Sequence, residues 1–204
     1  MTGHLIKSTL NTGSMTLISR ISGLVRDVVL ATSFGATLAA DAFYVAFRIP
    51  NFFRRIFGEG AFSQAFVPVL SEYRNRSDEA AIRVFISHMS ASLSLVLLLV
   101  VVLGVLAASG IVTLLAPGFL NNPEKFSTTV TMLQICFPYL LFISLVAMSA
   151  GIMNAYHHFT VPAFTPVLLN LCMIAAALLL APLMNGSVVA LAWGVFIAGF
   201  VQLF

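Results

Sequence analysis

Two long stretches without a charged residue constrain the fold of this chain more than any other feature. No Asp, Glu, Lys or Arg lies between Arg83 and Glu124, and none lies from Phe126 to Phe204. A helix that crosses a bilayer needs roughly 20 mostly apolar residues, so these stretches have room for at least four spans. Only 8% of all residues are charged, against about 25% in soluble domains. The sequence therefore predicts an integral membrane protein of the all-α class.

Turn residues divide the chain into six predicted spans of a polytopic transmembrane helix bundle. The spans cover about residues 13–34, 39–71, 80–116, 126–154, 161–182 and 188–204. Turns are expected at Gly35, at 121–123 and at 185–186, where Gly, Asn and Pro gather. The sixth span is still apolar at Phe204 and has no polar flank. We therefore expect the complete protein to continue beyond this residue.

Prolines and a polar loop mark further features of these spans. Pro50 and Pro68 are expected to interrupt the second span, and Pro138 to kink the fourth, because proline removes a helical hydrogen bond. Residues 72–79 form a polar loop, in which Ser77 or Asp78 is expected to cap the next helix. The two cysteines, Cys136 and Cys172, fall inside apolar stretches and are interpreted as buried hydrophobic residues rather than a disulfide or metal site.

The positive residues of the loops predict the orientation in the membrane. Lys7 precedes the first span, and Arg74, Arg76 and Arg83 surround the loop after the second. The first, third and fifth loops contain no Lys or Arg other than Lys125. The positive-inside rule then places the N-terminus and residues 72–83 in the cytoplasm. The net charge of +3 follows from this topology and does not argue for a nucleic-acid partner.

The first two spans contain charged residues at positions where charge is costly. Five are positive and three are negative: Arg20, Arg26, Asp27, Asp41, Arg48, Arg54, Arg55 and Glu59. A charged side chain at the bilayer centre costs about 2.5–3.5 kcal/mol on insertion scales. Five positive charges cannot all be neutralised by three negative ones, so a functional reason for the arginines is expected.

Three of these arginines are the predicted ligands of an anion. Arg20, Arg26 and Arg54 lie well inside their spans without an acid three or four residues away. Ser19 shares a helix face with Arg26. Guanidinium groups match phosphate oxygens bidentately and tolerate a partly dry cavity. The charge pattern therefore predicts a site for a large anion such as a phosphate or pyrophosphate.

A second interpretation stays open for the other charged residues. Arg48, Arg55 and Asp27 can reach the headgroup region or balance a neighbour. Arg55 and Glu59 are also spaced to pair on one helix face. Asn170 and other single polar residues of the later spans are interpreted as interhelical hydrogen bonds, and Gly104 and Gly194 as helix-packing residues. No motif of a hydrolase or nucleotide-binding protein is present, and no cofactor or metal site is expected.

Three segments of the first two spans resemble the MurJ (MviN) family of bacterial lipid II flippases, in the MOP exporter superfamily. They are SRISGLVRD at 19–27, DAFYVAFRIPN at 41–51 and FRRIFGEGAFSQAFVP at 53–68. APGF at 116–119 and PAF at 162–164 also fit. The resemblance covers essentially the whole chain, whereas the family has about fourteen membrane helices. Residues 1–204 would therefore be the N-terminal transmembrane lobe of such a transporter.

The resemblance implies a function in cell-wall synthesis. Family members move the undecaprenyl-pyrophosphate-linked peptidoglycan precursor across the bacterial cytoplasmic membrane by alternating access, without making or breaking a bond. It implies that Arg20, Arg26 and Arg54 hold the pyrophosphate. Ser19, Asp41 and Glu59 are further polar positions of the family. Asp27 and Arg55 are additional candidates for a supporting or gating role. The implied partners are lipid II, membrane lipids and the remaining helices, and any ion-coupling site would lie outside this segment.

Two other functions are weighed against this expectation. A drug or small-solute antiporter of the same superfamily would favour an acidic, aromatic-lined cavity for cations, whereas here arginines exceed acids. A membrane enzyme of cell-wall assembly would need catalytic carboxylates. The acids of the only polar loop, Glu72, Asp78 and Glu79, are better explained as loop and cap residues.

Overall fold

The computed structural model describes residues 2–35, 37–54, 66, 68–72, 78–156 and 159–204, with only the backbone described at 2–12, 38 and 53–54. No strand occurs among these residues. The helices are α1 (Thr2–Phe34), α2 (Leu38–Arg54), α4 (Glu79–Leu106), α5 (Ala108–Leu115), η2 (Pro117–Asn121), α6 (Pro123–Cys136), α7 (Tyr139–Ala155), α8 (Thr160–Ala175), η3 (Ala176–Leu180), α9 (Ala181–Leu183) and α10 (Val189–Leu203). The all-α fold expected from the sequence is confirmed.

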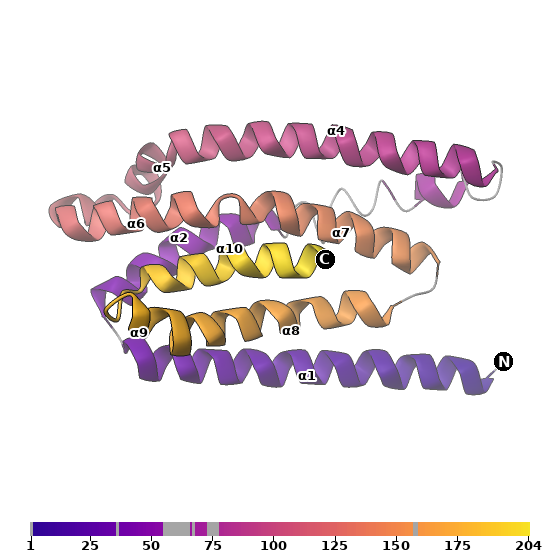
Figure 1. Cartoon of the computed structure of the whole chain (residues 1–204), viewed down its shortest axis with the longest axis horizontal. Helices are drawn as coiled ribbons and strands as arrows, with labels where there is room; N and C mark the ends of the chain where they lie inside the picture. Colours follow the sequence, from indigo (N-terminus) through magenta and orange to yellow (C-terminus); the bar gives the residue numbers. More distant parts are fainter. Residues whose placement is uncertain (1, 36, 55–65, 67, 73–77, 157–158) are drawn as a thin grey trace.

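The long helices lie side by side in a layered bundle (Figure 1). α4 forms one outer layer and packs on α7, and α1 forms the opposite outer layer and packs along α8. α2, α6, α7 and α10 lie between them, with α2 packed mainly on α6 and α10 packed on α7 and α8. The first helix and the second thus have different principal neighbours.

The turns form where the sequence supplies residues for them. Gly35 ends α1 with φ +61°, and Asn185 and Gly186 have φ +55° and +76° before α10, in the left-handed region that Gly and Asn tolerate best. The Asp78 carboxylate accepts the Ala81 N–H at 2.9 Å and caps α4. Asn122 caps α6 in the same way through the Lys125 N–H, at 3.0 Å.

The course of two predicted spans differs from expectation. α2 continues through Pro50, which lies inside the helix and is buried, so the interruption predicted there is wrong. Proline is tolerated in membrane helices because neighbouring groups satisfy the freed carbonyl. The stretch 80–116 is broken at Ala107, which separates α4 from α5. The break between α6 and α7, by contrast, falls at Phe137 and Pro138, where the sequence predicts a kink.

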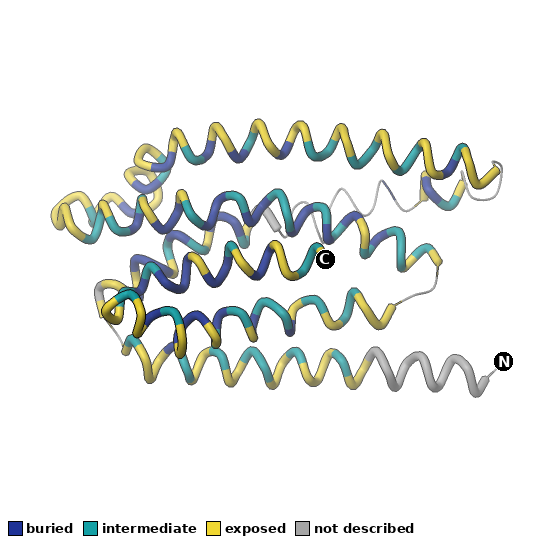
Figure 2. The backbone as a smooth tube through the Cα atoms, in the orientation of Figure 1, coloured by how far each residue is buried: buried dark blue, intermediate teal, exposed yellow. Residues whose placement is uncertain are grey.

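Three helical stretches of the described chain are long and apolar enough to cross a membrane: Glu79–Leu106, Pro123–Ala155 and Thr160–Leu183. Val189–Leu203 is a shorter apolar helix. Figure 2 shows exposed residues along the outer side of α4. The exposed residues of this helix include large apolar side chains such as Leu95, Leu99 and Leu106. An outer surface of this kind is suited to lipid rather than to water.

The interior is apolar and closely packed. α2, α6, α7 and α10 contribute most of a continuous core that includes Phe43, Leu133 and Tyr139. Small residues allow the helices to approach. A Cβ on Gly104 would meet the Phe137 ring, and a Cβ on Gly194 would lie 2.6 Å from the Cβ of Ala176. These glycines therefore pack helices, as expected from the sequence. Cys136 is buried and Cys172 half-buried, and neither forms a disulfide.

Candidate functional site

A cavity of about 600 Å³ lies between α1, α2, α7 and α8. Apolar and aromatic side chains such as Phe43, Phe47 and Met173 form much of its wall. Its polar lining comprises Ser19, Arg20, Arg26, Asp27, Tyr44, Asn51, Tyr139, Thr165, Asn170 and Gln202. Among the lining residues two are positive and one is negative, so the cavity carries an excess of one positive charge.

Arg20 is the cation of this cavity that has no compensating acid among the described residues. Arg20 lies on α1, is exposed and lines the cavity wall. In the described part of the chain, no hydrogen bond or ion pair joins its guanidinium to another residue. The five N–H donors of this group are therefore available to a ligand.

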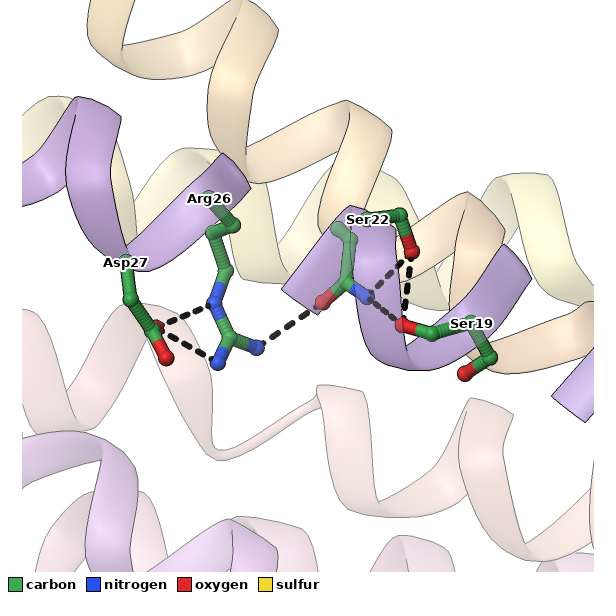
Figure 3. Close-up of polar contacts among 5 residues, drawn as sticks. Ser19, Ser22, Arg26 and Asp27 are labelled. Atoms are coloured by element: carbon green, nitrogen blue, oxygen red, sulfur yellow. Dashed lines mark hydrogen bonds and ion pairs between the residues drawn. The ribbon is translucent and has the colours of Figure 1, made fainter. Parts of the chain in front are cut away.

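Arg26 lies on the same helix and is held by two partners (Figure 3). Its Nε and Nη2 donate to one Asp27 carboxylate oxygen at 3.0 and 2.7 Å, and its Nη1 donates to Asn170 Oδ1 at 2.8 Å. The Arg26 side chain is 25% exposed and that of Asp27 62%. Asp27 therefore balances its neighbour Arg26, which is one of the two interpretations that the sequence left open for it. The absence of an acid three or four residues away does not leave Arg26 uncompensated.

Ser19, which shares a helix face with Arg26, and Ser22 belong to the same network. Asn170 Nδ2 donates to Ser22 Oγ at 2.9 Å and to the Ser19 carbonyl at 3.3 Å. The Ser22 hydroxyl also donates to the Ser19 carbonyl, at 2.9 Å. The network joins α1 to α8 at the cavity wall, and it confirms the interhelical hydrogen bond expected of Asn170.

Asp41 lies at the α1–α2 end of the bundle, away from this network. Its carboxylate pairs with Lys125 Nζ at 3.3 Å, and the Lys125 side chain is only 11% exposed. The same ammonium lies 4.0 Å from the centroid of the Phe119 ring. The only lysine of the predicted extracytoplasmic loops is thus held between an acid of α2 and a ring of η2. Asp41 also lines a hollow of about 330 Å³ that shares Leu30, Phe43 and Tyr44 with the main cavity.

The remaining predicted site residues lie outside what the structure describes. Arg55 and Glu59 are not among the described residues, and Arg54 ends α2 with only its backbone described. Their roles stay predictions. Arg48 is exposed and lines a separate hollow of about 290 Å³ beside Tyr44 and Asn51.

Three cavity residues had no signal as site residues in the sequence. Asn51 follows Pro50 in α2, Thr165 lies on α8 and Gln202 on α10. Gln202 Nε2 donates to the Thr165 carbonyl at 2.8 Å, so it joins α10 to α8. The sequence alone does not indicate which side of its helix a single polar residue faces. Only the packing of α2, α8 and α10 places these side chains at one cavity.

The fold and the site together define a polytopic helical membrane protein with a polar, net-positive cavity between its helices. Comparisons with known proteins specify the family. The family model described as "Lipid II flippase MurJ" matches residues 30–204. A "Probable lipid II flippase MurJ" of Buchnera aphidicola subsp. Acyrthosiphon pisum is 44% identical over 200 residues, covering 98% of this chain and 39% of the relative. A "Lipid II flippase MurJ" of Burkholderia cenocepacia is 45% identical over 199 residues, with the same coverage.

A solved structure agrees with these matches. "Lipid II flippase MurJ, inward closed conformation" superimposes with a TM-score of 0.80 at 32% identity, covering 95% of this chain and 40% of that one. The chain belongs to the MurJ family of lipid II flippases, and it is an inner membrane protein. It spans about two fifths of the length of the relatives it matches.

Proposed function

We propose that the protein containing this chain translocates lipid II, the undecaprenyl-pyrophosphate-linked peptidoglycan precursor, across the cytoplasmic membrane for cell-wall synthesis. The observation that carries the proposal is the net-positive cavity in which Arg20 has no partner among the described residues. A pyrophosphate carries several acceptor oxygens that guanidinium groups bind bidentately. The names of the relatives supply the identity of the lipid.

In this proposal the arginines of α1 and α2 bind the pyrophosphate. Arg20 and Arg26 line the cavity about 9 Å apart along α1, from six residues at 1.5 Å each, and Arg54 is the proposed third ligand. Ser19 and Asp27 support Arg26, and Arg55, Glu59 and Asp41 are proposed supporting or gating positions. The helices beyond this segment form the opposite wall, and rocking of the two lobes exposes the site to each side in turn. The polyprenyl chain stays in lipid, and no bond is made or broken, so the protein is not an enzyme.

The direct test is translocation by the full-length protein. Expressed in a bacterium depleted of its own flippase, it is expected to restore growth and the appearance of lipid II in the outer leaflet. Purified protein is expected to bind lipid II in preference to an organic cation and to show no glycan polymerisation. Growth without restored translocation, or preference for the cation, would contradict the proposal and favour another transport class.

We also propose that the N-terminus and the loop between α2 and α4 face the cytoplasm. The start of α1, the start of α4 and the α7–α8 connection lie at one end of the bundle (Figure 1), and Lys7 and Arg83 belong to that end. A membrane-impermeant maleimide applied to whole cells is expected to label a cysteine at Leu120, an exposed residue of η2, and not one at Asp78, after Cys136 and Cys172 are replaced. The reverse labelling pattern would contradict this orientation.

A further inference from the structure

Asn170, on α8, is a buried residue whose whole carboxamide is directed at α1. The residue is 5% exposed. Its oxygen accepts from Arg26, and its nitrogen donates to Ser22 Oγ and the Ser19 carbonyl. Both N–H groups and the oxygen therefore have partners, and all of these partners belong to one stretch of α1 (Figure 3), of which Ser19 and Arg26 line the cavity.

These contacts fix the Arg26 guanidinium and leave part of it available. Asp27 accepts from Nε and Nη2, and Asn170 accepts from Nη1. Three of the five N–H donors are used, so one on Nη1 and one on Nη2 remain for a ligand. Asp27 offsets the charge of Arg26, whereas Asn170 is neutral. Asn170 can therefore orient the group without reducing further its attraction for an anion.

We infer that Asn170 is a positioning residue of the anion site, one that holds Arg26 toward the cavity through a neutral hydrogen bond. This inference rests on the proposed function in taking pyrophosphate as the ligand. It extends the site from α1 and α2 to α8. It also explains why an amide suits this position better than a carboxylate, since an acid here would add a second negative charge beside Arg26.

A purely structural role for Asn170, as a link between α1 and α8, predicts different behaviour. If Asn170 acts through Arg26, its effect on anion affinity disappears once Arg26 is gone, because residues of one network are not additive. A structural link would lower affinity equally with and without Arg26. The Arg26→Gln background therefore separates the two roles. Asn170→Asp preserves the size of the side chain and its acceptor toward Arg26, but it adds a negative charge and removes the N–H donors to Ser22 and the Ser19 carbonyl.

The test measures binding of lipid II and of inorganic pyrophosphate to the full-length protein in nanodiscs, together with thermal unfolding. Asn170→Asp, and the shorter neutral Asn170→Ser, are expected to weaken binding roughly ten- to hundredfold, the scale of a hydrogen bond to a charged group. In an Arg26→Gln background Asn170→Ser is not expected to weaken binding further, whereas Asn170→Asp still places a negative charge at the cavity wall and is expected to weaken it. Ser144→Ala is the matched control, because Ser144 is buried on α7 and bonds only the Leu140 carbonyl of its own helix, at 2.7 Å.

Unchanged affinity in both Asn170 variants, or a loss from Asn170→Ser that is equally large in the Arg26→Gln background, would overturn the inference. The two probes separate this result from failure of the proposed function. If the protein binds pyrophosphate but not lipid II, the proposed function is contradicted, while the dependence of pyrophosphate binding on Asn170 still decides the positioning role.

Discussion

Replacing Arg20 with glutamine in the full-length protein is expected to abolish lipid II translocation and growth of a flippase-depleted strain. Arg20 lines the cavity and has no partner among the described residues, so its removal costs no described contact and the protein is expected to remain folded in the membrane. A bidentate contact consists of two charge-assisted hydrogen bonds, each worth about 1.5–3 kcal/mol. Their loss is expected to weaken binding by roughly 10²- to 10⁴-fold.

A second substitution tests whether the paired N–H donors of the Arg20 guanidinium are required or only its charge. Arg20→Lys keeps the charge but not the planar pair of donors, so it is expected to retain part of the binding. Arg83→Gln is the control. Arg83 is an exposed cation of α4 whose contact with Glu79, at 3.4 Å, is itself exposed. Lipid II binding and growth in the Arg20→Gln variant equal to those of Arg83→Gln would contradict the assignment of Arg20 as a ligand.

The fold class was predictable because its causes are local and repeated. Stretches free of charge between turn residues dictate membrane helices, and Gly35, Asp78 and Gly186 mark ends that the structure places at the same residues. The continuous helix through Pro50 was not predictable from the same signals. Whether a proline interrupts a helix in lipid depends on the neighbours that satisfy the freed carbonyl, and these neighbours come from distant parts of the chain.

The cavity was predictable only in part. Uncompensated arginines in α1 indicated an anion site, and Arg20 and Arg26 both line the cavity that the structure contains. The contribution of α8 to the cavity could not be predicted from the sequence, because Asn170 is separated from Arg26 by 144 residues. An isolated polar residue also does not indicate which neighbouring helix its side chain faces. The pairing of Arg26 with Asp27 agrees with the interpretation in which Asp27 balances a neighbour, one of two that the sequence left open. Adjacent residues of a helix point about 100° apart, but the long arginine side chain folds back far enough to reach its neighbour.

Adding one methyl group to Gly194 is expected to destabilise the bundle, because α10 packs at this residue on the end of α8 and the start of η3 without space for a side chain. The Cβ of an alanine would lie 2.6 Å from the Cβ of Ala176 and 3.3 Å from the Cys172 carbonyl oxygen. Both neighbours are rigid, so the helices must separate. Overpacking of this kind costs typically about 1–3 kcal/mol, and Gly194→Leu is expected to prevent folding. Thermal unfolding of the full-length protein in detergent measures the effect.

Gly110→Ala is the matched control for this prediction. Gly110 is also a helical glycine, in α5, and a Cβ there would meet nothing within 4 Å. The change is expected to be neutral or to stabilise by up to about 1 kcal/mol, the difference in helix propensity between Gly and Ala. Equal destabilisation by the two substitutions would mean that the loss comes from the helix backbone and not from contact between α10 and α8.

A compensating substitution distinguishes a local clash from a general weakening of α10. In Gly194→Ala combined with Ala176→Gly the closest pair of carbon atoms no longer exists, and only the approach to the Cys172 carbonyl remains. The double variant is therefore expected to be more stable than Gly194→Ala alone, although Ala176→Gly alone lowers stability through the conformational freedom of glycine. Because α8 carries Asn170, the variant that separates the helices is also expected to weaken pyrophosphate binding, and the compensated one to recover it. Recovery of stability without recovery of binding would show that the α8 wall of the cavity does not depend on its packing against α10.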